Sequence, residues 1–343
     1  MKTISFGLLV FLLWSSQVPA QTPYFQGKTI RILVGYPAGS AHDLWARMIA
    51  PQLTKHIPGN PNTIVENRAG AGSMVATNFV YEVAKPDGMT LAVINAALYF
   101  DQLLKRPEAK FDWSKLTWVG STTPTNALLY MWAAAPYKTI HEVRSAAVPP
   151  KCGATGTGNT GYYLPKLLEQ AIGAKFTLVT GYQGGAEIEI GVERGEVQCR
   201  AFTVQVFFGR EPFHTWRSKN LVRVLVQTGK KRDERLPDTP LLSELMNQYQ
   251  TSDGIRRLAT VLLGSGEFGS APMIGSPGIP AEVVKILRAG HAKALSSPEL
   301  IAEAKKRGFE PEHIAGEELE ALAKEVLSQP ANVVASMKKV MGE

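Results

Sequence analysis

The chain has little cysteine and lacks the residue spacings that mark a metal site. Cys152 and Cys199 are its two cysteines among 343 residues, and its six histidines are dispersed. No pair of these residues stands at a spacing typical of zinc ligands or of a redox motif. We therefore assign no metal. For the cysteines, two buried thiols are the interpretation that we favour, and a disulfide is the alternative.

Motifs of common nucleotide-binding and hydrolytic sites are missing as well. No Gly-rich run precedes GK[ST] as in a P-loop, and no G-x-S-x-G marks a nucleophile elbow. Gly156–Gly161 (GTGNTG) fits a dinucleotide pattern, but the next predicted strand ends in LVTGY where an acid is needed.

His42 and Asp43 are sequence neighbours, so their side chains point apart on a helix. Asp43 is better explained as a helix cap or as the i,i+4 partner of Arg47. We expect no cofactor and no enzyme activity.

Basic residues outnumber acidic residues without forming a stripe. The chain has 37 Lys and Arg against 30 Asp and Glu, a formal net charge of +7. These charges are scattered and are not interleaved with aromatic residues, which argues against nucleic acid as a partner. A mildly positive surface suits anionic small ligands or an acidic partner face.

Only the first twenty residues hold a long apolar run with a targeting pattern. MKTISFGLLVFLLWSSQVPA has one early positive charge, Lys2, an apolar stretch from Ile4 to Trp14, and small residues before a cut near Ala20. A bilayer span takes about 20 apolar residues, so this stretch is too short to be one. We predict a cleavable signal peptide over residues 1–20, with an uncleaved anchor as the alternative. The mature chain would carry a charge of +6, because Lys2 is lost and 36 basic residues remain against 30 acidic residues.

What the sequence does contain is a strand–helix pattern that occurs twice. The first set runs from Thr29 to Ala96 and the second from Pro150 to Phe202, each reading β-α-β-α-β. Two β-rich runs, Trp118–Ala135 and Leu221–Gly229, could cross between the sets. We predict an α/β fold of two domains, each a mainly parallel sheet flanked by helices, joined by two crossing strands. The predicted bounds are 28–123 plus 230–343 for the first domain and 124–229 for the second.

The loops that follow the predicted strands share one composition. They are rich in Gly with Ser, Thr, Asn or Gln, and each is expected to open a helix. Helix N-termini have unpaired N–H groups and a dipole that favours anions, so several of them could hold an anion without a cationic side chain. Tight turns and caps explain any single loop equally well. Because parallel sheets bind ligands beyond the carboxyl ends of their strands, we expect a site between the domains.

Several motifs occur in the order of a known family. They include GYPAGSAHDLWAR (35–47), VENRAGAGS (65–73) and KPDGMTL (85–91), followed by GYQGGAE and SPGIPAEVVKIL. The chain resembles the periplasmic solute-binding proteins of tripartite tricarboxylate transporters over nearly all of its mature length. This resemblance implies a "Venus flytrap", a small organic acid as ligand, membrane permease subunits as partners, a periplasmic location and a monomer. A sensor component for a membrane kinase, or an exported enzyme using the same cleft, is the alternative.

The resemblance also implies a set of ligand-binding residues and bears on the cysteines. Ser40 stands where the family usually has glycine, and Thr180-Gly181-Tyr182 replaces its V-P-Y. In the strand order 2-1-3 that the family implies, the strand of Cys152 neighbours the strand of Cys199, so a disulfide between them remains the alternative to two buried thiols. The residues carried over are Tyr36, Pro37, Ala38, Gly39, Ser40, Asp43, Ala71, Gly72, Ser73, Asn95, Ala96, Thr155, Gly156, Thr157, Gly158, Asn159, Tyr182, Gln183, Gly184, Thr203 and Gln205.

Overall fold

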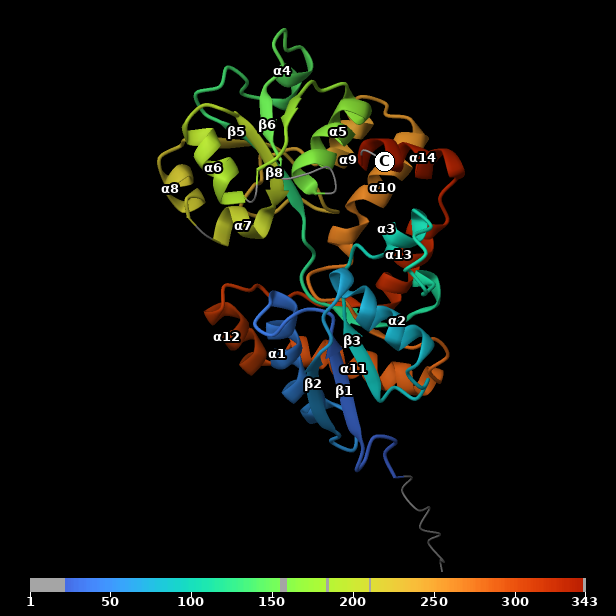
Figure 1. Ribbon diagram of the computed structural model, residues 1–343. Helices are drawn as coiled ribbons and strands as arrows, with labels where there is room; N and C mark the ends of the chain where they lie inside the picture. The colour runs from blue at the N-terminus through green and yellow to red at the C-terminus, as the bar shows by residue number, and fades with distance from the viewer. Residues whose placement is uncertain (1–21, 155–158, 183–184, 210, 342–343) are drawn as a thin grey trace, which may run out of the picture.

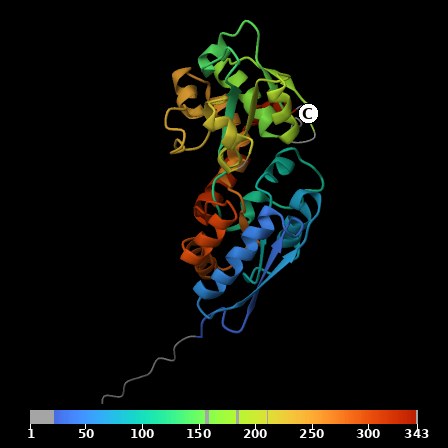
Figure 2. The same cartoon turned by 90° about the vertical axis from the view of Figure 1, so that its left-hand side faces the viewer.

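The computed structural model describes residues 22–154, 159–182, 185–209 and 211–341, and it arranges them in two lobes. Figures 1 and 2 show one lobe above the other, each with its own sheet and helices. The predicted α/β class with two sheet-containing domains is confirmed. The predicted signal peptide, 1–20, lies outside the described residues. Within the described ranges, no helix has the length and apolar character needed to cross a membrane.

The lower lobe is built on a six-stranded sheet. Its strands are β1 (Thr29–Val34), β2 (Asn62–Asn67), β3 (Thr90–Val93), β4 (Thr117–Ser121), β10 (Met273–Gly275) and β11 (Ile314–Ala315). They lie in the order β11-β4-β10-β3-β1-β2. β1 pairs in parallel with both β2 and β3, which gives the 2-1-3 order of a doubly wound half. β10 runs antiparallel to β3 and β4.

Helices cover this sheet because their apolar positions recur at helical spacing. In the first helix, Trp45, Ile49 and Leu53 are buried together with Ile30 and Ile32 of β1. The helices of the lower lobe are α1 (Ala41–His56), η1 (Ala71–Ser73), α2 (Met74–Glu82), α3 (Tyr99–Leu103), η2 (Trp113–Lys115), α11 (Ala281–Leu295), α12 (Pro298–Lys306) and α13 (Gly316–Leu327).

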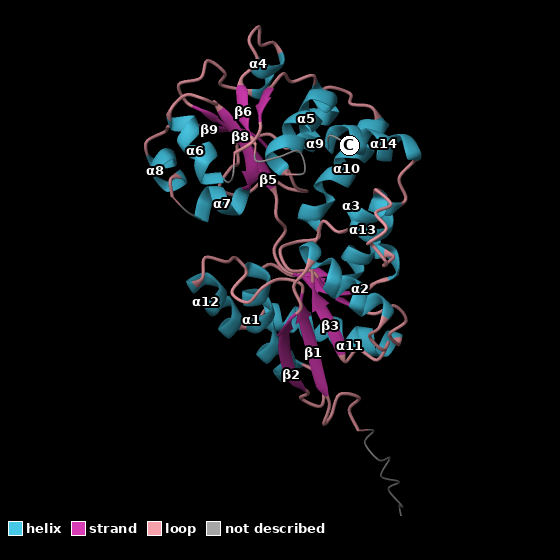
Figure 3. Cartoon of the chain, viewed as in Figure 1, coloured by secondary structure: helices cyan, strands magenta, loops and turns pink. Residues whose placement is uncertain are grey.

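The upper lobe repeats this arrangement on a five-stranded sheet (Figure 3). Its strands are β5 (Ala127–Trp132), β6 (Lys151–Gly153), β7 (Thr177–Val179), β8 (Cys199–Thr203) and β9 (Val222–Gln227). The order is β7-β6-β8-β5-β9, and β6 pairs in parallel with β7 and β8, so the 2-1-3 order recurs. Its helices are α4 (Ile140–Arg144), α5 (Thr160–Ile172), α6 (Gly185–Glu193), α7 (Val204–Gly209) and α8 (Phe213–Ser218).

Three helices from the C-terminal third of the chain pack against α5 of the upper lobe. They are α9 (Leu242–Gln248), α10 (Asp253–Glu267) and α14 (Ala331–Met341). The buried hydroxyl of Thr251, between α9 and α10, donates to the backbone oxygen of Ala171 at the end of α5 (2.5 Å). The domain bounds given above stay a prediction, and these contacts show that parts of 230–343 lie beside the upper sheet.

Three segments connect the lobes, and two of them hydrogen-bond to each other. The third, residues 328–330, leads from α13 in the lower lobe to α14 beside α5. Residues 122–126 lead from β4 in the lower lobe to β5 in the upper lobe. The chain returns to the lower lobe between α10 and β10, and not along residues 221–229 as the sequence predicted. That run forms β9, which pairs with β5 in the upper sheet. Between the connections, Thr125 N donates to Gly266 O (2.9 Å) and Ser270 N donates to Thr123 O (3.1 Å). Gly269 has a φ of +80°, and a Cβ there would lie 2.1 Å from Thr122 O, so only glycine fits.

Cys152 and Cys199 form a disulfide, so our preference for two buried thiols was wrong. Cys152 on β6 is the direct parallel partner of Cys199 on β8, and their Cα atoms are 4.4 Å apart. This spacing is at the short end of the range that a disulfide allows. Both side chains are fully buried, and the bond links two neighbouring strands of the upper sheet.

His291 of α11 is a buried histidine in the core of the lower lobe. Its side chain is 0 % exposed, and its Nδ1 lies 3.4 Å from Nδ1 of His313. A Cβ at Gly120 would be 2.5 Å from the same nitrogen, so the ring packs tightly on β4. Burial, together with the neighbouring His313, lowers the pKa of His291 to about 3. The folded protein therefore keeps this ring neutral over the mildly acidic range.

We expect acid to destabilise the fold through His291. The unfolded chain takes up this proton near pH 6.5, whereas the folded chain takes it up only near pH 3. The unfolded state therefore binds more protons, and stability is lost as the pH falls from 6.5 toward 3. By linkage, His291 alone should lower the free energy of unfolding by about 2 kcal/mol between pH 7 and pH 5.

Urea unfolding at pH 7 and pH 5 checks this prediction, with His291→Gln as the matched variant. The wild type should lose about 2 kcal/mol more than the variant over this interval. Equal losses in the two proteins would show that His291 is not the group responsible.

Candidate functional site

The loop between β1 and α1 is fixed by hydrogen bonds from its own residues. Ser40 is the N-cap of α1, and its Oγ accepts from the backbone N–H of Asp43 (3.3 Å). Asp43 in turn accepts from the backbone N–H of Gly39 (2.9 Å). Pro37 and Ala38, at the tip of the loop, are exposed. The loop therefore presents a rigid tip, and the hydroxyl hydrogen of Ser40 is still available for donation.

The carboxylate of Asp43 is turned into the lower lobe. Arg47 Nε lies 3.0 Å from each of its oxygens, and Asn67 Nδ2 donates to it at 2.8 Å. Burial alone would raise the pKa of Asp43, but the hydrogen bonds from Arg47, Gly39 and Asn67 lower it below its ordinary value. Asp43 is 2 % exposed. Asp43 therefore stabilises the loop through its hydrogen bonds to Gly39, Arg47 and Asn67, and its predicted pairing with Arg47 is confirmed.

Tyr36 and His42 flank the same loop and stack on each other. Their ring centroids are 4.1 Å apart with an interplanar angle of 22°. Burial lowers the pKa of His42 to about 4, so its ring is neutral at pH 7. Tyr36, which was carried over as a ligand-binding residue, therefore has one ring face covered by an uncharged imidazole.

The loops after β2 and β3 meet beside the first loop. Ala71, Gly72 and Ser73 all have positive φ, at 45°, 60° and 85°, which places the start of α2 in a tight left-handed turn. A Cβ at Gly35 would lie 1.9 Å from Ser73 Oγ, so glycine is required where the first and second loops touch. From the third loop, Asn95 Nδ2 donates to Gly72 O (3.3 Å). Ala96 follows it and is partly exposed.

These three loops lie at the end of the lower lobe that faces the upper lobe. In Figure 1, β1 and β3 run toward the upper lobe, and β6 runs from α4 toward the lower lobe. The carboxyl ends of the two parallel sets therefore face each other, where ligands bind to open α/β sheets.

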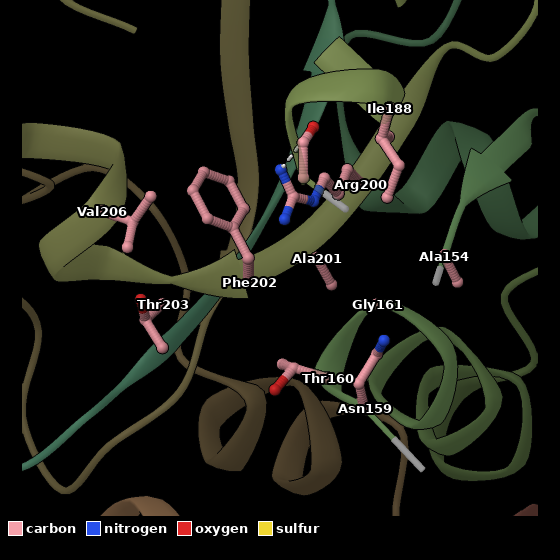
Figure 4. A pocket seen from close by; sticks show the side chains of 11 residues that line it. Ala154, Asn159, Thr160, Gly161, Ile188, Arg200, Ala201, Phe202, Thr203 and Val206 are labelled. Atoms are coloured by element: carbon pink, nitrogen blue, oxygen red, sulfur yellow. Dashed lines mark hydrogen bonds between the residues drawn. The ribbon is translucent and has the colours of Figure 1, made fainter. Parts of the chain in front are cut away.

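A cavity of about 360 Å³ opens at the carboxyl end of the upper sheet. Figure 4 shows Asn159 and Thr160, at the start of α5, across the cavity from Phe202, Arg200 and Ile188. The sequence predicted Asn159 and Thr203 as site residues, and both line this cavity. The residues of its wall that the structure describes are Ala154, Asn159, Thr160, Gly161, Gly185, Ile188, Arg200, Ala201, Phe202, Thr203 and Val206.

Arg200 is a lining residue that sequence reasoning missed. It lies within β8, and its Nη1 is 2.7 Å from Glu189 Oε1 of α6. An arginine inside a predicted buried strand, Glu196–Phe202, was the available signal, because a buried charge needs a partner. Its proximity to α6 could not be read from the strand alone.

Two of the residues predicted in the upper lobe, Tyr182 and Gln205, do not line this cavity. Tyr182 points along α6, and its hydroxyl donates to Glu196 Oε2 (3.4 Å). Gln205 of α7 donates through Nε2 to Pro124 O of the first connection between the lobes (2.6 Å). Gln205 therefore binds the connecting segment. Six further predicted residues lie outside the described part of the chain: Thr155, Gly156, Thr157, Gly158, Gln183 and Gly184.

Comparison with protein families places the chain beside transport receptors. The family described as "Tripartite tricarboxylate transporter family receptor" matches residues 45–338. A relative from Cupriavidus necator, "UPF0065 protein in gbd 5'region", is 26% identical over 323 residues, which cover 92% of this chain and 89% of that protein.

Solved structures share the fold. A TctC solute-binding protein from Polaromonas superposes with a TM-score of 0.71 at 20% identity, over 92% of this chain and 98% of that chain. The R. palustris protein Rpa4515, whose structure contains adipate, superposes with a TM-score of 0.56 at 19% identity, again over 92% and 98%. At these identities the likeness establishes the two-lobed architecture.

Proposed function

The chain belongs to the tripartite tricarboxylate transporter family of receptors, and from this premise we propose that it captures a small carboxylate between its lobes for delivery to membrane transporter subunits. The family and the fold are those of periplasmic solute-binding proteins rather than of enzymes. The observation that carries the proposal is that the loop between β1 and α1 and the carboxyl end of the upper sheet, where the cavity opens, lie on the facing sides of the two lobes. The adipate in Rpa4515 supports a carboxylate as ligand.

Capture would work by a shift between open and closed arrangements of the lobes. A ligand that contacts both lobes binds the closed arrangement better and therefore populates it. Residues 122–126 and 266–270, two of the three connecting segments, would act as the hinge, because they join the lobes and hydrogen-bond to each other. The closed form would then dock on the membrane subunits. We also propose that residues 1–20 direct export to the periplasm and that the protein acts as a monomer.

A thermal-shift screen with mono-, di- and tricarboxylates and aromatic acids tests this proposal. A ligand present at one hundred times its Kd stabilises the folded state by about 2.7 kcal/mol, so a true ligand should raise Tm measurably. Isothermal titration then gives the affinity. If no acid in the panel shifts Tm, the carboxylate proposal fails.

We expect Ser40→Trp to block binding while the protein still folds. The indole would extend from the tip of the lower loop, next to exposed Ala38 and Gly39, into the space between the lobes. Affinity for the acid found in the screen should fall by about 100-fold or more, since an overfilled site must open or exclude the ligand. Isothermal titration measures this change.

Ser40→Ala is the matched control, because it removes the cap without adding bulk. Losing an N-cap costs about 1 kcal/mol of stability, which a urea titration would detect in both variants. Binding by Ser40→Trp at wild-type affinity would exclude this loop from the site.

A further inference from the structure

The only charge on the cavity wall, within the residues that the structure describes, is already neutralised. Arg200 pairs with Glu189 at 2.7 Å, and the two side chains are 13 % and 4 % exposed. Arg200 also donates to Gly185 O (3.3 Å), and its guanidinium carbon lies 4.7 Å from the ring centroid of Phe202. The guanidinium is thus held between a buried carboxylate and an aromatic ring.

The remainder of the wall separates into a polar side and an apolar side. Asn159 and Thr160 provide an amide and a hydroxyl at the start of α5, and Thr203 adds a second hydroxyl. On the apolar side, Phe202 and Ile188 lie close to Arg200 (Figure 4). Ala154, Ala201 and Val206 complete the apolar lining.

We propose that the part of the ligand that packs on the apolar side of this cavity is uncharged, so that the ligand is a monocarboxylate with a hydrocarbon or aromatic body. This inference rests on the proposed function and narrows its ligand class. Its carboxylate stays at the polar side, near Asn159, Thr160 and the facing Ser40 loop. Its body packs against Phe202, Ile188 and Val206.

The charge pair is the reason that a second carboxylate is disfavoured. A second carboxylate on the apolar side of the cavity would have neither a cation nor the amide and hydroxyl of Asn159 and Thr160 beside it, which is unfavourable for a buried charge. Otherwise it would have to take Arg200 from Glu189, and the buried Glu189 would then lose the cation of this ion pair. An arginine in a carboxylate-binding cavity suggests an anchor for the ligand's carboxylate, but here Arg200 forms an ion pair with Glu189 of the protein itself.

Hexanoate and adipate form a matched pair that tests the inference. Both have six carbons in line, and they differ in one end group, a methyl in hexanoate and a carboxylate in adipate. Isothermal titration at pH 7 should give hexanoate an affinity at least about 10-fold higher than that of adipate. The methyl end of hexanoate packs against the apolar side of the cavity, whereas adipate would place a carboxylate there. Benzoate should also bind more tightly than adipate.

Each outcome of this titration has a distinct meaning. Adipate binding as tightly as hexanoate, or more tightly, would overturn the inference and leave the proposed carboxylate function standing. Binding of neither acid, and of no other acid in the thermal-shift panel, would overturn the proposed function and with it this inference.

Two variants separate the roles of the charged pair and the apolar wall. In the double variant Glu189→Met with Arg200→Met, hexanoate affinity should stay within about 3-fold of wild type, since no net charge is removed. A loss of about 100-fold there would instead identify Arg200 as the carboxylate anchor and contradict the inference.

Val206→Asp, on the partly exposed helix α7, should weaken hexanoate binding by about 10-fold or more because it places a charge beside the ligand's body. Unchanged affinity in Val206→Asp would show that the body does not enter here.

Discussion

Replacing both cysteines by alanine is expected to lower the free energy of unfolding by about 4 kcal/mol. The bond joins residues 47 positions apart, so it removes many conformations that the unfolded chain would otherwise sample. It also ties β6 to β8, the strands at whose carboxyl ends the cavity opens. Losing the bond therefore acts mainly by favouring the unfolded state, and the cavity should keep its shape under native conditions.

Urea unfolding of the oxidised wild type and of the double variant Cys152→Ala with Cys199→Ala measures this effect. The wild type that has been reduced in denaturant and refolded with reductant is the control, because it keeps both sulfur atoms and lacks only the bond. The reduced wild type should lose most of the stability that the double variant loses. A difference between oxidised and reduced wild type below about 1 kcal/mol would contradict the chain-entropy argument.

The cysteines also illustrate how far the sequence could predict the fold. The repeated β-α-β-α-β pattern was sufficient for the α/β class and for two lobes, and the family resemblance implied that the strands of Cys152 and Cys199 are neighbours. Adjacency of strands does not determine which residues are direct partners, because register depends on how α5 and α6 pack on the sheet. That register places Cys152 opposite Cys199, and it could not be derived from periodicity.

Side-chain direction explains the differences at the candidate site. The pairing of Asp43 with Arg47 follows from helical spacing alone, and the structure contains it. Tyr182 and Gln205 follow strands as predicted, but tertiary partners set their directions, Glu196 for the first and Pro124 O for the second. Arg200 enters the cavity wall because Glu189, on a different element, neutralises it. Such partners are distant in sequence, so local patterns do not reveal them.

Glu189→Met alone is expected to lower the free energy of unfolding by about 3 kcal/mol, because it leaves the buried Arg200 without its carboxylate partner. Arg200→Met should be similarly destabilising, since Glu189 is 4 % exposed and would lose the cation of its ion pair. The double variant should be close to wild type, because neither charge then has to be removed from water and the methionines fill similar volume. Because each single variant loses about 3 kcal/mol and the double variant loses almost nothing, the coupling between the two substitutions would be about 6 kcal/mol in magnitude.

Urea unfolding of these four proteins gives the coupling directly, and an exposed ion pair provides the comparison. Nη2 of Arg307, the residue that follows α12, lies 2.6 Å from Oε1 of Glu303 in that helix, and the two side chains are 43% and 41% exposed. Glu303→Met should cost about 0.5 kcal/mol or less, since solvent screens such pairs. If the double variant at 189 and 200 were destabilised by the sum of its singles, the two charges would be acting independently. The cavity wall would then no longer count as neutral, and the argument for a monocarboxylate would lose its physical basis.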